Sequence, residues 1–335
     1  MATIETINTS SVHSLRAQLP HTVLAALAIA AGIIIPRMIG SQLLLTLMVP
    51  AVINAILATS VGMLFRFNGV ISFGHAAFYG LALYMLGLAI NRLGLPPELA
   101  IVVALLLPTL VAFVLGLYIV GISGAAFAML TLAVGMAFYE IALKARNLTG
   151  GDDGFSFDMP GRTFGLETSA YQSPDTMFAI CWVVLVLTLL GLTLLSHSRF
   201  GRVAIAIREN EERARFIGYT TRLHRALVFS LSALIAALSG VLAGLYTAYT
   251  SPESLATDVS GYALIMAITG GPKLVWGPAL GAVIFFLFKD IVGDHTEHWQ
   301  AMVGIAVTAV ILLIPQGIGG LLNDLFRRFA ARRSD

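Results

Sequence analysis

The densest cluster of charged side chains in this 335-residue chain lies between two long apolar runs. Glu209 precedes Arg213 and Glu211 precedes Arg215, each by four residues with the acid first. That order is the favourable one for an ion pair on one face of a helix. The chemistry that such a segment offers is recognition of a charged partner surface. Seven arginines occupy it: Arg199, Arg202, Arg208, Arg213, Arg215, Arg222 and Arg225.

The spacing predicts one amphipathic helix over 200–218, which Gly218 is suited to end. A charged helix between membrane spans can bind a groove in a partner protein or lie on the lipid surface. The mixed signs of the charges and the lack of lysine favour the protein groove. We therefore expect Arg208, Glu209 and Asn210 to contact a partner.

A second group of candidate residues consists of polar side chains within apolar runs. Ser72 and His75 lie in the glycine-rich stretch 67–80, and Thr131 lies in a later run. Polar groups at membrane depth are costly and are functional candidates by default. His75 either hydrogen-bonds a polar solute or satisfies the backbone of a broken helix, and the sequence leaves both interpretations open. We expect the three side chains to face a cavity instead of lipid.

Motifs for covalent chemistry are absent from the sequence. It has no G-x-x-x-x-G-K-[ST] phosphate loop, no H-E-x-x-H and no G-x-S-x-G. His295 and His298 flank Glu297 without further metal ligands nearby, and Cys181 is the single cysteine. The chain is therefore not its own nucleoside triphosphatase, and we expect neither enzymatic activity nor a cofactor bound by this chain.

Composition sets the class of protein. Hydrophobic residues make up 58% of the chain and charged residues only 11%, against about 25% charged in soluble domains. A soluble protein of this size would lack the polar surface to cover itself. The net charge of +2 gives no reason to expect a nucleic-acid partner. The sequence predicts an all-α integral membrane protein, a polytopic bundle of about 8–10 transmembrane helices in contact with lipid.

Ten apolar segments are the predicted spans: 22–39, 41–64, 73–91, 98–120, 123–143, 175–196, 226–249, 259–271, 276–293 and 300–315. Lysine and arginine mark cytoplasmic loops, so the arginine-rich loop 197–225 is expected inside the cell. With that threading the segment 1–21 is a cytoplasmic N-terminal segment, 22–320 is the transmembrane domain and 321–335 is a basic cytoplasmic tail. The loops 144–174, 250–258 and 294–299 then lie outside.

The span pattern also contains a weak inverted repeat. The blocks 41–143 and 226–315 each hold about four spans and one glycine-rich break, at 67–80 and 269–281. Interrupted segments in corresponding halves of a membrane protein point to a transport pathway at the midplane. Close packing of helices through small residues is the alternative explanation.

Four stretches together resemble the LivM-like permease subunits of ABC importers for branched-chain amino acids. The resemblance runs from about Asn54 to Gly320. The stretches that carry it are Ile71–Gly80, Phe127–Ala133 with Leu148–Gly154, Arg199–Arg202 with Ala206–Glu211, and Gly270–Gly271 with Trp276–Pro278 and Gly281–Ala282.

The resemblance implies a set of partners and a location. The chain would pair with a second, homologous permease, two ABC ATPase subunits that hold ATP and Mg, and an external solute-binding protein. It would reside in the bacterial cytoplasmic (inner) membrane as a multi-pass protein with both termini inside. The segment resembling the family's coupling loop would seat in an ATPase, through Gly201, Arg208, Glu209, Asn210, Glu211, Arg213 and Gly218. In that family the glycine-rich stretches build the translocation pathway. We expect Ser72, His75 and Thr131 along this substrate pathway because they are polar side chains beside glycine-rich or broken helices.

Departures from the family pattern leave the solute open. Met136 stands where relatives usually carry an acid, and Leu81–Tyr84 replaces a Gly-Ala-Tyr. Branched-chain amino acids, other amino acids, amides, urea and carboxylates are all carried by importers of this group. The alternative class is a secondary transporter or channel that works without an ATPase.

Overall fold

The computed structural model describes residues 22–23, 25–32, 34, 41–122, 124–159, 161–293, 295–296, 298–314 and 316–331. Side chains are described as far as Asp324. The predicted cytoplasmic segment 1–21 and the residues 332–335 of the predicted tail lie outside the described residues.

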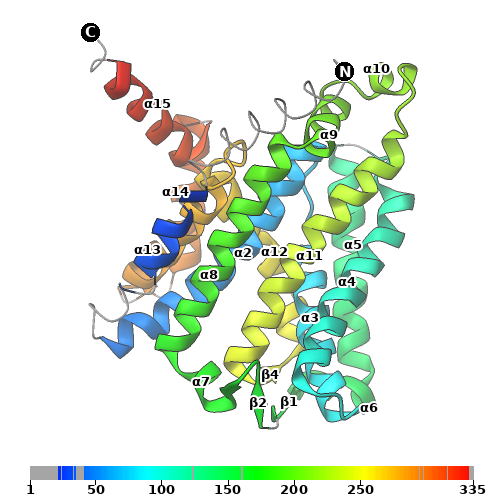
Figure 1. Ribbon diagram of the computed structural model, residues 1–335, viewed down its shortest axis with the longest axis vertical. Helices are drawn as coiled ribbons and strands as arrows, with labels where there is room; N and C mark the ends of the chain where they lie inside the picture. The colour runs from blue at the N-terminus through cyan, green and yellow to red at the C-terminus, as the bar shows by residue number, and fades with distance from the viewer. Residues whose placement is uncertain are drawn as a thin grey trace, which may run out of the picture.

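The described residues form a helical bundle (Figure 1). Its principal helices are α2 (Gln42–Asn68), α3 (His75–Asn91), α4 (Pro97–Ile119), α5 (Ala125–Lys144), α8 (Pro174–His197), α9 (Arg199–Glu209), α11 (Thr221–Thr247), α12 (Thr257–Gly270), α13 (Gly277–Gly293), α14 (Trp299–Leu313) and α15 (Gly317–Ala331). The short elements are α6 (Arg146–Thr149), η1 (Gly151–Asp153), β1 (Phe155–Ser156), β2 (Arg162–Thr163), β3 (Leu166–Glu167), α7 (Thr168–Gln172), α10 (Glu211–Phe216), β4 (Tyr249–Thr250) and η2 (Pro252–Leu255).

Two 27-residue helices, α2 and α11, form the centre of the bundle. Helix α2 packs on α8, α11 and α13, and α11 packs on α2, α3 and α4. Small residues permit these close approaches: a Cβ atom at Gly240 of α11 would lie 2.1 Å from the carbonyl oxygen of Tyr79 in α3. At this point the backbones of α3 and α11 are in direct contact.

Five of the described helices, α2, α4, α5, α8 and α11, are long and apolar enough to cross a membrane. A sixth span results if α14 and the start of α15, bent by 43°, are counted together. The predicted spans over 73–91, 259–271, 276–293 and 300–315 are helices, but of only 17, 14, 17 and 15 residues. The apolar runs thus coincide with helices wherever the structure describes them, and five or six of the described helices are long enough by themselves to cross a membrane. The predicted span 22–39 lies partly outside the described residues.

Helices α2 and α11 each end in a left-handed residue, Gly69 (φ 70°) and Ala248 (φ 50°). A connecting segment follows in both cases, irregular after α2 and containing β4 and η2 after α11, and then a shorter helix, α3 or α12. The starts of these two short helices meet, because the backbone N–H of Ala76 donates to Oγ of Ser260 at 2.8 Å. The break that lies opposite 69–74 is therefore 248–256. The predicted counterpart over 269–281 is a different break, the turn between α12 and α13.

The connecting segments separate onto two sides of the bundle (Figure 1). β1 pairs antiparallel with β4, so the loops 144–174 and 250–258 lie on one side. Helices α9 and α10 lie at the opposite end. There the side chain of Asn68, at the end of α2, donates to the carbonyl oxygen of Arg225, near the start of α11, at 3.0 Å.

Candidate functional site

Helix α9 turns sharply away from the end of α8. The hydroxyl of Ser198 accepts a hydrogen bond from the N–H of Gly201 at 3.1 Å and caps the new helix. A Cβ atom at position 201 would lie 2.0 Å from the carbonyl oxygen of Leu195. Gly201 is buried and permits this turn, so its role in the segment is to set the direction of α9.

The predicted single helix over 200–218 is wrong, because the segment breaks at Asn210. Helix α9 ends at Glu209, and the side chain of Asn210 accepts from the N–H of Arg213 at 2.8 Å to cap α10. Asparagine competes with the helical backbone in this way and favours N-cap positions. The expected ion pair between Glu209 and Arg213 does not form, because the two residues belong to different helices. The other expected ion pair is present, with Nη2 of Arg215 3.6 Å from Oε1 of Glu211.

The predicted helix end at Gly218 is confirmed. Gly218 has a φ of 94° and its N–H donates to the carbonyl oxygen of Arg215 at 3.0 Å. The N–H of Tyr219 donates to the carbonyl oxygen of Ala214 at 3.1 Å. These two bonds form a Schellman motif, which satisfies the last carbonyl groups of α10.

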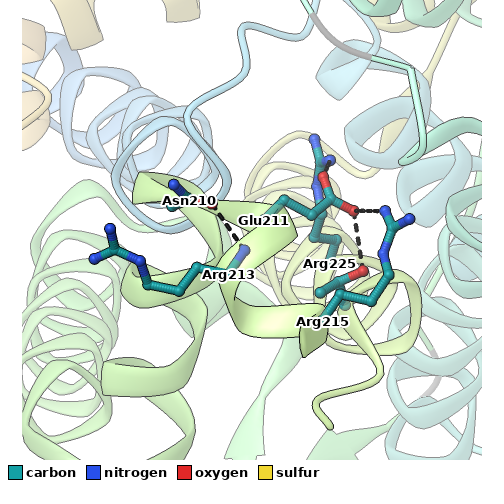
Figure 2. Close-up of polar contacts among 6 residues, drawn as sticks. Asn210, Glu211, Arg213, Arg215 and Arg225 are labelled. Carbon is teal, nitrogen blue, oxygen red and sulfur yellow. Dashed lines mark hydrogen bonds and ion pairs between the residues drawn. The ribbon is translucent and has the colours of Figure 1, made fainter. Parts of the chain in front are cut away.

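Glu211 is the polar centre of the segment (Figure 2). Its carboxylate accepts from the guanidinium of Arg225 at 2.7 Å and from the hydroxyl of Thr221 at 2.9 Å. The side chain of Arg225 is 10% exposed and that of Glu211 33%, so this ion pair is partly shielded from water. By contrast the Arg215 side chain is 68% exposed. The contacts with Arg225 and Thr221 join α10 to the first turns of α11.

Arg208 joins α9 to α2. Its Nη1 donates to the carbonyl oxygen of Arg66 at 2.7 Å, and its side chain packs over Gly69. A guanidinium at this position satisfies an orphan carbonyl group and is favoured by the negative end of the α2 dipole. Arg208 therefore anchors the segment inward as well as lying on its exposed surface.

The outward surface of α9 and α10 is concave. A groove of about 510 Å³ runs between the two helices and includes Glu209, Asn210 and Arg213 in its lining. Ile217, which lines the groove, is 71% exposed, and Phe216, the residue before it, is 89% exposed. A mixed-charge groove beside exposed apolar side chains suits the docking of a protein surface. We call this surface, residues 199–219, the α9–α10 surface.

The polar residues predicted within the membrane are buried. Ser72 is 1% exposed and its hydroxyl accepts from the N–H of Gly74 at 3.2 Å. Thr131, 2% exposed, accepts from the N–H of Phe73 at 3.2 Å. Both side chains thus satisfy the irregular backbone between α2 and α3, and Thr131 ties that stretch to α5.

His75 is fully buried at the start of α3. Its Nε2 lies 2.6 Å from Oγ of Ser232 in α11, and the Ser232 hydroxyl donates to the carbonyl oxygen of Ser60 at 3.0 Å. The ring makes edge contacts with Phe78 and Phe229. Nδ1 is buried and has no hydrogen-bond partner in the part of the chain that the structure describes. His75 therefore joins three helices and retains one free ring nitrogen.

A comparison with protein-family models decides the class. The model described as "Branched-chain amino acid transport system / permease component" matches residues 43–315, most of the chain. The chain belongs to this family.

Individual relatives agree with this assignment. The permease is 25% identical over 286 residues to the high-affinity branched-chain amino acid transport system permease protein LivM of Escherichia coli K12, covering 79% of this chain and 67% of the relative. It is 30% identical over 151 residues to LivH of the same organism, covering 44% of this chain and 49% of the relative. It is also 33% identical over 108 residues to the autoinducer 2 import system permease protein LsrC of Salmonella paratyphi B, covering 32% and 31% of the two chains. No solved structure matches the chain significantly.

Sequence reasoning missed some of the residues that hold these sites together. Ser232 and Ser260 bind the start of α3. Their signal was a hydroxyl inside an apolar run. The sequence presents Arg225 only as one of seven arginines, because its pairing with Glu211 depends on how α10 folds back on α11. Ser72 and Thr131 come together around one stretch of backbone, while His75 contacts α11.

Proposed function

We propose that this permease imports branched-chain or related amino acids, or a similar small amide or carboxylate. It would act as one of a pair of homologous permeases, driven by two ABC ATPases and supplied by an external binding protein. LivM and LivH, whose names state branched-chain amino acid transport, support both the solute class and the pairing. The protein would reside in the inner membrane, with both termini and the α9–α10 surface in the cytoplasm.

The observation that carries this proposal is the architecture of the α9–α10 surface. Its inner side is fixed to the bundle, through Arg208 to α2 and through Glu211 to α11. Its outer side is open, with a charged groove and the exposed side chain of Phe216. A partner that fills the groove would therefore move α2 and α11, the two central helices.

The mechanism follows from these connections. ATP binding on the partner subunits would close the ATPase pair and shift α9 and α10. The shift would reach α2 through the Arg208–Arg66 contact and α11 through Glu211–Arg225. Because Asn68 links the same ends of α2 and α11, the two helices would respond together. Access to the membrane midplane would then alternate between the two sides.

We place the solute route beside the meeting point of α3 and α12, where Ser72, His75 and Thr131 lie. Both short helices begin there, and half-helix N-termini at membrane depth suit anionic groups such as an amino-acid carboxylate. The free Nδ1 of His75 adds a hydrogen-bonding atom at the start of α3.

Uptake by the complete complex in proteoliposomes tests the proposal. Accumulation of labelled leucine that requires ATP and the binding protein, and that persists without an ion gradient, is the expected result. Uptake that follows an ion gradient and ignores ATP would identify a secondary transporter, and downhill flux alone would identify a channel.

A further inference from the structure

A second groove, of about 510 Å³, opens near the end of α2 on the side of the bundle that carries α9. Apolar side chains form most of its lining, including those of Ala28, Val186, Leu190, Leu274 and Trp276. Trp276 is 39% exposed, so the groove opens to the surface of the subunit. Its walls come from the helical residues 25–32, from α8 and from the turn between α12 and α13.

Cations lie in this groove and next to it. Arg66 lines the groove, and a guanidinium nitrogen of Arg66 donates to the carbonyl oxygen of Lys273, the residue just before the lining residues Leu274–Trp276. Arg208 lies against the same turn of α2, with its Nη1 2.7 Å from the Arg66 carbonyl oxygen. None of the three cations forms an ion pair with an acid among the described residues.

Arg66 also has unused hydrogen-bonding capacity. Its Nε is buried and has no partner in the described part of the chain. Burying a charged donor without a partner is costly. An anion at the mouth of the groove would compensate the charge of the Arg66 guanidinium and would offset its repulsion with Arg208.

We propose that this groove binds an anionic phospholipid. The phosphate would lie against Arg66 and Lys273, and an acyl chain would lie along the apolar side chains of α8. Basic pockets between transmembrane helices on the cytoplasmic side are a known setting for such headgroups. A free phosphate would match the cations and leave the apolar wall unfilled, so the lining favours the lipid. The proposal does not depend on the transported solute.

The test uses the intact complex, purified in a neutral detergent, and native mass spectrometry of the lipids that it retains. Phosphatidylglycerol is added in competition with phosphatidylcholine of the same acyl chains. Wild type should retain phosphatidylglycerol at least fivefold more, and Arg66→Gln and Lys273→Gln should each reduce that preference at least threefold. Lys273 is exposed, so its variant reports on binding even if Arg66→Gln folds poorly.

Arg222→Gln is the matched control. Arg222 also contacts a backbone carbonyl group, that of Leu117 in α4, but neither Arg222 nor its sequence neighbours line this groove. Its variant should keep the wild-type preference. Equal retention of the two lipids by wild type, or an equal preference in wild type and both groove variants, would overturn the proposal. Inorganic phosphate that displaces phosphatidylglycerol completely at millimolar concentration would assign the site to a free anion and would also overturn it.

Discussion

The carboxylate of Glu211 accepts a 2.7 Å hydrogen bond from the guanidinium of Arg225, and this pair fixes α10 to α11. The backbone carbonyl group of Arg225 in turn accepts from the side chain of Asn68 in α2. One acid on the α9–α10 surface is thereby connected to both central helices. A surface that transmits force needs such a connection, because exposed ion pairs hold their partners weakly.

Replacing Glu211 with glutamine should lower the stability of the subunit by about 2 kcal/mol. The change leaves the largely buried Arg225 guanidinium without its anionic partner. Thermal unfolding of the purified subunit measures the loss. Arg215→Gln is the matched control, because Arg215 contacts the same carboxylate from an exposed position and should contribute less than about 1 kcal/mol. Equal losses of stability in the two variants would show that the shielded Glu211–Arg225 pair contributes no more than the exposed Glu211–Arg215 pair.

For the α9–α10 surface, the sequence predicts features that depend on local backbone conformation better than contacts between different helices. Gly218 ends the segment as expected because a helix stop depends on local backbone conformation. The break at Asn210 also has a local cause, an N-capping side chain followed by Glu211 and Glu212, which the i,i+4 spacing of the charges does not report. The pairing of Glu211 with Arg225 joins residues of two helices, so no helical period reports it.

The same contrast between local features and contacts between helices holds for the two helix breaks at 69–74 and 248–256. The break before His75 is visible in the sequence because glycines surround it. The segment that lies opposite, 248–256, overlaps the loop 250–258 that the distribution of lysine and arginine places outside. In the structure it packs back onto α3, where a Cβ atom at Gly80 would lie 2.6 Å from the side chain of Leu255. Only tertiary packing brings these two segments together.

Gly201→Ala should displace α9 and lower retention of the ATPase partner. The added methyl group would collide with the Leu195 carbonyl oxygen, which belongs to backbone and cannot rotate away. Gly191→Ala, in α8, is the control, since nothing lies within 4 Å of its added Cβ atom. The control should be neutral or stabilising by up to about 1 kcal/mol. Unfolding temperature and co-purified ATPase are the two readouts, and a Gly201→Ala protein that matches the control in both would count against this geometry.

His75→Leu should lower the rate of uptake at least tenfold while the complex still assembles. The substitution removes the free Nδ1 at the start of α3, and Ser232 keeps its bond to the Ser60 carbonyl oxygen. Ser232→Ala removes the other member of the contact and leaves the imidazole in place. If the His75 variant transports at the wild-type rate, His75 has only a packing role. If both variants lose stability and uptake in parallel, the His75–Ser232 bond is structural.

Cysteine labelling tests the sidedness of the permease. Cys181 is fully buried and can be replaced first. A cysteine at exposed Ser169 should react with a membrane-impermeant reagent added outside intact cells, whereas one at Phe216 should react only in inverted vesicles. Labelling of the position-169 cysteine only from the cytoplasmic side would contradict the predicted topology, in which the loop 144–174 lies outside.

The most direct test of the account is charge reversal in the groove of the α9–α10 surface. Glu209→Arg alters a residue that lines the groove, and Glu212→Arg makes the same change at an exposed residue of α10 outside the lining. Loss of a docked charge costs about 2–5 kcal/mol, and each 1.4 kcal/mol is a factor of about ten in affinity. We predict that Glu209→Arg loses at least about tenfold in co-purified ATPase at an unchanged unfolding temperature, while Glu212→Arg retains it. Wild-type ATPase retention and ATP-driven uptake by Glu209→Arg would contradict the assignment of this surface to an ATPase.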